Sequence, residues 1–429
     1  MIIAGAPHAI LTATSNHIII GNAPQVLALS SADKHGFTVN GVFYSEASGT
    51  IKSSEVKEFD GNLTLNDFKV AIYTSTNLDK VENYSDIDGD SADPQEPFKV
   101  QMTNYWWYDN NGVRIMGDDK KKMIGCGSGF SMPLKLIIKT DVKAQSEYGI
   151  PNESESVTLA KTYQIAAKSE ICYAKPNATI THQNAQWHGF DKNGNSQKWN
   201  LESSIINPEY GGGRTNDYVL NFGFKAKPTV SSKTFPTTGF PGAKFQLVMT
   251  GVQTDYEFSV ITGSKDIIDI DSLGFITLKK KPLGELTVQA TLKRDKSVKH
   301  NYSFNPTNIW AIPQSDFRDY WDIAQAKCGG AFNILSRDEL TNSPQRKAPM
   351  YWNFKDNNYS RAIGGGLTAE WGQMNQTSYP SSDWRDAHYW TRDNYSPERH
   401  FVVHTVNGGV GYDSYENKIG KINYIACKG

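Results

Sequence analysis

The chain has few cysteines and no excess of charge of either sign. Its 429 residues include four cysteines, and the formal net charge is −1. Because no charged field is present to steer nucleic acid or an anionic membrane, neither is an expected partner. No stretch approaches the roughly 18 apolar residues of a membrane-spanning helix, so the sequence predicts no transmembrane segment.

The cysteines are isolated from one another, at positions 126, 172, 328 and 427. They form no CxxC pair and no Cys/His cluster with zinc spacing. An even number of isolated cysteines favours two disulfides in separate domains, and therefore an oxidising compartment. In that case Cys126 and Cys172 are near enough in the chain to pair. The alternative is four reduced, buried thiols in a cytosolic protein.

The N-terminal stretch 1–7 lacks the basic and apolar regions of a secretory signal. If the disulfides form, we expect the chain to be a fragment of a larger exported protein, or to leave the cell by another route.

The composition favours a mainly β protein of three or four domains. Gly is abundant, with 36 residues, and short apolar runs alternate with turn residues. An aromatic strand at 104–108 is expected to turn a Trp inward, as immunoglobulin-like sandwiches do. Regular short strands between 229 and 306 predict a second sandwich. The predicted segments are an N-terminal β segment that is a partial or separate Ig-like unit (1–65), an Ig-like domain (66–176), a connecting segment (177–228), a second sandwich (229–306) and a C-terminal unit (307–429).

The last unit is rich in tryptophan. It holds six of the ten tryptophans, at positions 310, 321, 352, 371, 384 and 390. A helix is predicted over 315–328 with Ser315 as its N-cap, and a second helix after Ser336. Aromatic residues at this density, without a catalytic motif beside them, indicate a protein that binds rather than one that transforms.

No arrangement of side chains predicts catalysis. The stretch 125–129 is not a GxSxG motif, because Cys126 takes the place of its first glycine. His400 and His404 are four residues apart on a predicted strand, which separates them by roughly 13 Å, too far for one metal ion. Paired carboxylates lie in no recognisable cleft motif. We therefore expect no enzyme activity and no required cofactor.

Four aspartates in one loop are weak candidates for a structural calcium site. Asp86, Asp88 and Asp90 alternate, and Asp93 follows. Ca²⁺ prefers oxygen ligands of this kind. The alternative is a polar turn between strands, because the later Glu and the flanking helices of an EF-hand are missing.

The C-terminal residues resemble a known family. The helix with Cys328 and Gly-Gly, the segment 335–340, the Glu370-Trp371-Gly372 stretch and the ending 424–427 resemble a C-type-lectin-like domain. The whole is similar to enterobacterial surface adhesins of the intimin and invasin type, and 235–245 looks like the start of one of their bacterial Ig-like repeats. The resemblance implies a long-range pair between Cys328 and Cys427. The sugar-binding motifs of calcium-dependent lectins are absent, so the resemblance favours a protein ligand.

The resemblance implies tandem Ig-like β-sandwiches followed by an α+β C-type-lectin-like domain, exposed extracellularly or on the bacterial surface. The expected function is adhesion to a host cell-surface protein or glycan, with the last hundred residues as an autonomous, disulfide-closed piece. Aromatic and polar loop residues are the candidate ligand contacts: Asp383, Trp384, Arg385, Asp386, His388 and Tyr389. The alternatives are a glycan-binding lectin and the targeting component of a secreted toxin.

Overall fold

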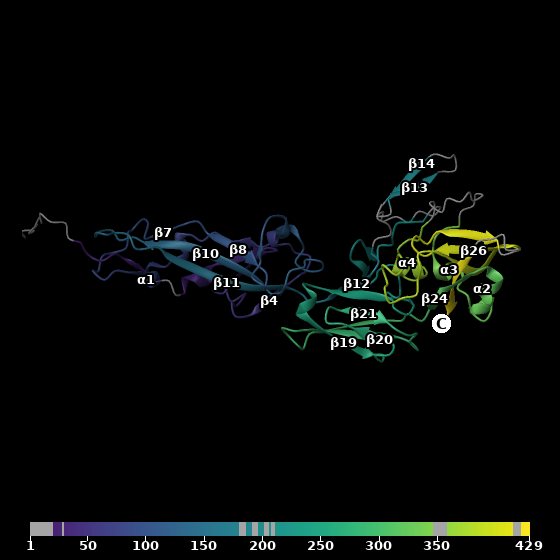
Figure 1. The fold of residues 1–429 in the computed structure, drawn as a ribbon. Coiled ribbons are helices and arrows are strands. Elements are labelled where there is room, and N and C mark those ends of the chain that lie inside the picture. The colour runs from purple at the N-terminus through teal and green to yellow at the C-terminus, as the bar shows by residue number, and fades with distance from the viewer. Residues whose placement is uncertain are drawn as a thin grey trace, which may run out of the picture. The chain divides into compact units, whose positions relative to one another are not determined.

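The structure is a computed structural model that describes residues 20–27, 30–179, 206, 211–345, 358–414 and 422–429, and the backbone of 186–190 and 196–200. Two compact units make up the chain (Figure 1). Unit 1 comprises Met1–Phe59, Leu63–Lys122 and Pro133–Ala166. Unit 2 comprises Asp60–Asn62, Met123–Met132 and Ala167–Gly429.

Unit 1 is a β-sandwich. One layer is the sheet β4-β11-β10-β8-β9, to which β7 adds at the end of β10, and the other contains β3-β2-β5. A further pair, β1 and β6, is antiparallel. The elements are β1 Gln25–Val26, β2 Gly36–Val39, β3 Val42–Ser45, β4 Val56–Phe59, β5 Lys69–Val70, α1 Lys80–Asn83, β6 Tyr84–Ser85, β7 Phe98–Val100, β8 Asn104–Tyr108, β9 Arg114–Ile115, β10 Leu134–Ala144 and β11 Val157–Ala167.

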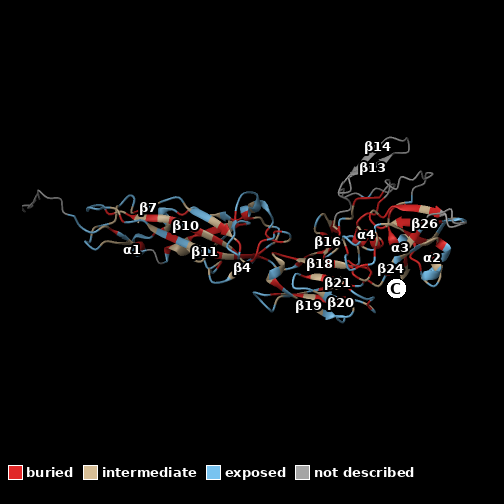
Figure 2. Ribbon diagram, in the orientation of Figure 1, coloured by how far each residue is buried: buried red, intermediate tan, exposed pale blue. Residues whose placement is uncertain are grey.

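The core of unit 1 follows from strict alternation along its strands. In β10 every second residue, from Leu134 onward, is buried, as Figure 2 shows along this strand. From the opposite layer, Phe37 packs on Tyr163 with ring centroids 5.7 Å apart. Trp107 is 1% exposed and meets Phe68 at 5.3 Å. The prediction that the aromatic strand turns a Trp inward is confirmed.

The predicted boundary at residue 65 is wrong. β2 pairs with β5, and β4 pairs with β11, so strands from both sides of that position share sheets. Strands of two to four residues cannot form an independent domain, and they complete the sandwich instead. Residues 1–19 of the predicted N-terminal segment lie outside the described residues.

Unit 2 begins with another β-sandwich (the second sandwich). Its layers are the sheets β15-β16-β12-β18-β21-β20 and β19-β22-β23. The core is aromatic, with Phe245 of β18 against Phe304 of β23 at 5.3 Å. The strands are β12 Ile171–Pro176, β15 Tyr218–Val219, β16 Gly223–Lys225, β18 Lys244–Met249, β19 Tyr256–Thr262, β20 Ile268–Ile270, β21 Phe275–Leu278, β22 Leu286–Leu292 and β23 Lys299–Phe304.

The strand pairing in this sheet differs from the prediction for two segments. β12 was expected to close the first domain, but it pairs with β18 and belongs to the second sandwich. The segment 177–228 is predicted to connect or decorate domains, but its end supplies β15 and β16, which extend the same sheet. Earlier in this segment, β13 Gln186–Phe190 pairs with β14 Ser196–Asn200. The sequence missed β15 and β16 because strands of two or three residues leave little periodicity.

The C-terminal module (residues 307–429) combines one mixed sheet with short helices. The sheet order is β17-β24-β28-β25-β26-β27. The elements are β17 Thr238–Gly239, β24 Ile309–Asp319, α2 Trp321–Lys327, α3 Arg337–Leu340, α4 Leu367–Trp371, β25 His388–Ser396, β26 Arg399–His404, β27 Val410–Ser414 and β28 Asn423–Lys428. β17 comes from residues before the module and pairs in parallel with β24.

The helix predicted over 315–328 begins too early. Residues up to Asp319 continue strand β24, and the helix starts at Trp321 after Tyr320. Pairing of Arg318 and Asp319 with β28 satisfies the backbone in the extended form and outweighs the helical spacing of the side chains. The second helix is confirmed: Ser336 caps α3 in a capping box with Glu339.

The module and the second sandwich share one hydrophobic core. Trp371 of α4 packs on Phe235 at 5.0 Å and on Phe240 at 5.4 Å. Figure 2 shows the burial around α4. The continuous cluster runs from Ile171 to Ala426. The expectation of an autonomous C-terminal piece is therefore wrong, because its central Trp is covered by residues of the preceding segment.

A buried carboxylate joins the same two regions. Glu370 is fully buried, and its Oε1 accepts hydrogen bonds from the Thr237 hydroxyl at 2.7 Å and Gly364 N–H at 2.9 Å. Its Oε2 accepts from the hydroxyl and the N–H of Thr238, at 2.7 and 3.0 Å. Burial raises the pKa of this carboxyl, while the hydrogen bonds from Gly364 and Thr237 act to lower it. Dense hydrogen bonding makes a buried carboxylate tolerable here.

Both cysteine pairs form disulfides. Cys328 at the end of α2 is bonded to Cys427 of β28, as the resemblance implied. Cys126 is bonded to Cys172 of β12, so the expected pairing is confirmed. This bond lies in unit 2 rather than in the first Ig-like domain, because the loop Met123–Met132 belongs to unit 2.

Candidate binding surface of the C-terminal module

The loop that leads into β25 carries the predicted ligand contacts, but two of them are buried. Trp384 is 0% exposed, with its ring 4.9 Å from Tyr389 and 5.9 Å from Phe240. Tyr389 is equally buried, and its hydroxyl accepts a hydrogen bond from Arg385 N–H at 3.0 Å. The prediction that these two rings contact a ligand is therefore corrected. The two buried rings hold the loop in place.

The remaining candidates lie at the surface and are polar. Asp383 accepts a hydrogen bond from the Ser315 hydroxyl at 3.1 Å, and Arg385 donates to Gln376 at 2.6 Å. Asp386 lies 3.6 Å from Nε2 of His404, whose ring packs on that of His388 at 4.6 Å. Charges of both signs on an anchored loop suit the polar rim of a protein interface.

The two histidines of the HxxxH pattern have different surroundings. His400 is buried and stacks on Trp321 with ring centroids 3.7 Å apart. Burial lowers the pKa of His400 to about 4. His404 faces the exposed loop instead. No metal-binding role is indicated for the pair.

Phe332 is a surface residue that sequence reasoning missed. It is 88% exposed in the short helical turn Ala331–Asn333. The turn follows Gly329 and Gly330, both with positive φ, and the amide of Asn333 donates to the Cys328 carbonyl at 2.9 Å. Beyond it, Ile334 forms a bridge to Cys427. The signal in the sequence is an aromatic residue directly after a Cys-Gly-Gly turn.

A second missed group lies at the other end of the β25–β26 hairpin. Tyr395 stacks on Tyr412 at 4.0 Å with nearly parallel rings, and Arg399 lies over Tyr412 at 5.0 Å. Tyr395 itself is 41% exposed. Tyr and Arg are enriched among residues that dominate interface energetics.

The aspartates of the predicted calcium loop do not converge. Asp86 accepts hydrogen bonds from the N–H groups of Asp88 and Asp90, at 2.8 and 3.3 Å. Asp88 binds the side chain of Asn22, and Asp93 caps its own turn. Within the described ranges no group of three or more acidic, His or Cys side chains is arranged as metal ligands are. The structural calcium ion stays a prediction without support from this geometry.

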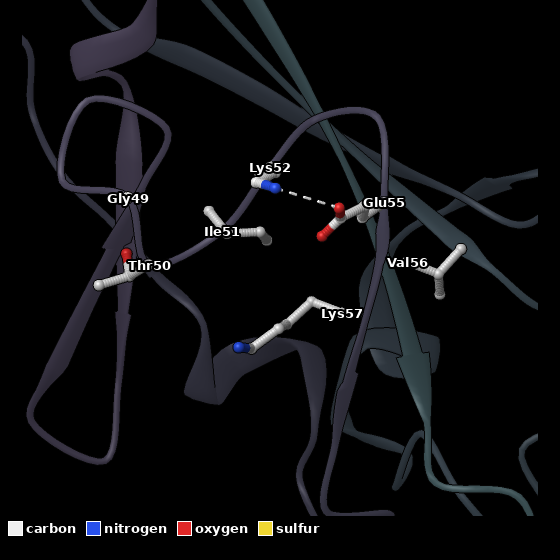
Figure 3. A pocket seen from close by; sticks show the side chains of 7 residues that line it. All are labelled: Gly49, Thr50, Ile51, Lys52, Glu55, Val56 and Lys57. Atoms are coloured by element: carbon white, nitrogen blue, oxygen red, sulfur yellow. Dashed lines mark hydrogen bonds and ion pairs between the residues drawn. The ribbon is translucent and has the colours of Figure 1, made fainter.

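Unit 1 has a small hollow at its surface. It has a volume of about 170 Å³ and is lined by residues 49–52 and 55–57. Figure 3 shows Lys52 and Glu55 at its edge, joined by an ion pair of 3.3 Å. Ligand pockets usually measure about 300–1,000 Å³ and are mostly apolar. This hollow is smaller and more polar than the pockets that hold small molecules.

The second sandwich matches a known protein family. Residues 223–304 match the family model of invasin, domain 4. The chain is 27% identical over 220 residues to the inverse autotransporter adhesin YeeJ of Escherichia coli (strain K12), which covers 50% of this chain and 8% of that adhesin. The resemblance to intimin/invasin-type adhesins is confirmed. The chain matches only a small part of the length of this relative.

Solved structures of two such adhesins are similar at low identity. Invasin, described as a bacterial integrin-binding protein, aligns at 16% identity over 93% of this chain and 60% of its own, with a TM-score of 0.38. A fragment of intimin in complex with the intimin-binding domain of its translocated receptor aligns at 12% identity over 77% of this chain and 86% of its own, with a TM-score of 0.33.

The curated relative is an adhesin by name, and the absence of enzyme activity in this chain stays a prediction. The fold is mainly β with Ig-like sandwiches, as expected. Across the described residues, no helix combines the length and the apolarity needed to cross a membrane.

Proposed function

We propose that this chain is the receptor-binding part of a bacterial surface adhesin, exposed outside the cell. The C-terminal module contacts a host cell-surface protein, and the Ig-like sandwiches before it act as the spacer. The observation that carries the proposal is Phe332, a large apolar side chain that is 88% exposed on a disulfide-anchored turn.

The physical argument rests on the cost of ordering. Full burial of a Phe side chain contributes about 1.5–3 kcal/mol. A mobile loop loses much of this gain when it is fixed on binding. The turn that carries Phe332 is held at one end by Cys328 and at the other by the bridge from Ile334 to Cys427. Phe332 is therefore presented in advance to a partner with a matching apolar recess.

In this proposal the polar candidates provide further contacts of the module with the receptor. Asp383, Arg385 and Asp386 supply hydrogen bonds and charge, while the buried Trp384 and Tyr389 keep their loop in place. Charged groups at the edge of an interface influence association rate and selectivity more than affinity. Phe332 and Tyr395 supply the apolar contact.

Binding of the full chain to host epithelial cells tests the proposal. Phe332→Ala is expected to weaken binding about tenfold or more in apparent Kd, as loss of an aromatic anchor does. Leu283→Ala is the matched control, because Leu283 is fully exposed in the second sandwich. Equal binding by Phe332→Ala and the wild type would refute a role for this turn.

Pretreatment of the cells separates a protein receptor from a glycan. Protease treatment is expected to abolish binding, and periodate oxidation of surface sugars is expected to leave it intact. The reverse pattern would favour the lectin alternative, in which the exposed Tyr395 ring stacks on a sugar.

A further inference from the structure

The outer face of the long sheet in unit 1 carries a feature that the adhesin proposal does not use. Trp106 and Trp107 are neighbours in β8, so their side chains point to opposite faces of the sheet. Trp107 fills the core, whereas Trp106 is partly exposed on the outside. The strands β8, β10 and β11 lie side by side in Figure 1.

Strand register places cations around this outer Trp. Trp106 is directly opposite Ile137, and Tyr108 is opposite Lys135. Lys139 is opposite Asn104, at the next outward position along β10. Directly opposed residues of an antiparallel pair point to the same face, with Cβ atoms about 4.5–5.5 Å apart. Two lysines therefore flank an aromatic pair in the middle of the sheet.

Neighbouring strands extend the same surface. On one side, Arg114 of β9 is opposite Tyr108. On the other, Gln164 is opposite Lys135 and Thr162 is opposite Ile137. The outer face thus presents rings, cations, an amide and a hydroxyl, in rows that cross four strands.

The cations of this face are not neutralised. Among the described residues no ion pair is formed by Arg114, Lys135 or Lys139. The carboxylate of these cross-strand rows, Asp141, accepts a hydrogen bond from the Thr158 hydroxyl. Further along the sheet, by contrast, Lys99 and Lys143 share Glu153 at 3.1 and 2.6 Å. The three cations around Trp106 and Tyr108 therefore have no ion-pair partner among the described residues.

We propose that this face binds an acidic polysaccharide with a carboxylate on alternate sugars. The faces of Trp106 and Tyr108 suit the apolar faces of sugar rings, and the three cations suit carboxylates. Lys135 and Lys139 are four residues apart, or about 13 Å along the strand. This distance exceeds one sugar ring, so it fits widely spaced charges more than dense sulfation. The face works independently of the C-terminal module.

A single-stranded nucleic acid also combines rings with anions, but it is disfavoured here. Sequence-independent binding of that kind uses a positively charged groove along the strand. Three cations around two rings on an open sheet face offer much less charge, in a chain whose formal net charge is −1. Oligo-dT therefore serves as a competing probe.

Titration of the full chain with a hyaluronate decasaccharide, followed by tryptophan fluorescence and calorimetry, tests the proposal. The wild type is expected to bind it, and to bind neutral dextran and oligo-dT much more weakly. Trp106→Ala is expected to raise Kd about tenfold, and Lys139→Gln about threefold. Tyr148→Ala and Lys52→Gln change an exposed ring and a cation elsewhere in unit 1, and they are expected to leave Kd unchanged.

Three results would overturn the proposal: no binding of hyaluronate by the wild type, an unchanged Kd in Trp106→Ala, or tighter binding of oligo-dT. If Trp106→Ala fails to fold, the double variant Lys135→Gln/Lys139→Gln must show the loss instead. Trp106→Ala is expected to bind host cells as the wild type does. Failure here and failure of the receptor proposal are thus separate outcomes.

Discussion

Units 1 and 2 use aromatic residues and charge in different ways. Unit 1 closes a two-layer sandwich around Phe37, Phe68 and Trp107, and no disulfide lies among its described residues. Unit 2 joins a sandwich to a C-terminal module through Trp371, the buried Glu370 and a shared core, and it holds both disulfides. The two parts of unit 2 therefore share one core, whereas the aromatic core of unit 1 is built from the two layers of a single sandwich.

The largest expected effect tests that dependence. Trp371→Ala removes a fully buried ring that contacts Phe235 and Phe240, and is expected to lower the free energy of unfolding of unit 2 by about 3–5 kcal/mol. Hydrogen exchange measured by mass spectrometry should show loss of protection in β18 and β25 together, with β10 of unit 1 unchanged. Protection lost only in the C-terminal module would mean that the shared core is not cooperative.

Removal of the Cys328–Cys427 bond is the next test. The disulfide closes a separation of 99 positions, and its replacement by serines is expected to cost about 2–4 kcal/mol. Since the core is shared, urea unfolding should shift for the second sandwich and the module at the same midpoint. A sandwich that keeps its stability while the module melts would restore the view of an autonomous C-terminal piece.

Glu370→Leu should cost slightly less, about 2–3 kcal/mol. The substitution removes a buried charge but leaves the N–H groups of Thr238 and Gly364 without their acceptor. Thermal unfolding of the full chain measures the loss. Lys428→Gln, which removes a partly exposed ion pair with Glu339 and leaves the capping box of α3 in place, is a milder comparison within the same module. An equal loss in both variants would count against a joining role for Glu370.

Each unit buries a histidine whose pKa is lowered by burial, His35 in unit 1 and His400 in unit 2, and the shift to about 4 makes His400 the sharper test of pH dependence. Because burial depresses its pKa from 6.5 to about 4, the folded state takes up its proton later than the unfolded state as the pH falls. The stabilisation is present above about pH 6.5 and is lost progressively towards pH 4, by about 3 kcal/mol. The stability of His400→Gln, measured across this range, should depend less on pH. Identical profiles would refute the assignment.

Much of this organisation was predictable from the sequence, and the exceptions share a physical cause. Alternation found the strands of both sandwiches, and the Ser336–Glu339 capping box fixed α3. Domain boundaries failed where short strands such as β5 and β16 pair over long sequence separations. The helix start failed because β28, far away in the chain, captured residues up to Asp319.

The candidate site was only partly predictable for the same reason. The loop 383–388 was located correctly, but burial of Trp384 depends on Phe240, which comes more than a hundred positions earlier. Phe332 was missed because a single aromatic residue in a turn has no periodic pattern. Local sequence patterns specify helices and strands, whereas the exposure of a side chain depends on residues that are distant in the chain and packed against it in the fold.

The smallest expected effect is that of Trp106→Ala, and its neighbour Trp107 in β8 supplies the comparison inside unit 1. Trp107→Ala should destabilise unit 1 by about 3–5 kcal/mol, since its ring is enclosed by the core. Trp106→Ala should change stability by less than about 0.5–1 kcal/mol, because its ring lies on the solvent side of the same sheet. Urea unfolding of both variants measures the difference. A large loss of stability in Trp106→Ala would show that the outer ring is a packing residue. A small loss would mean that the ring has no structural role, as the proposed ligand-binding face requires.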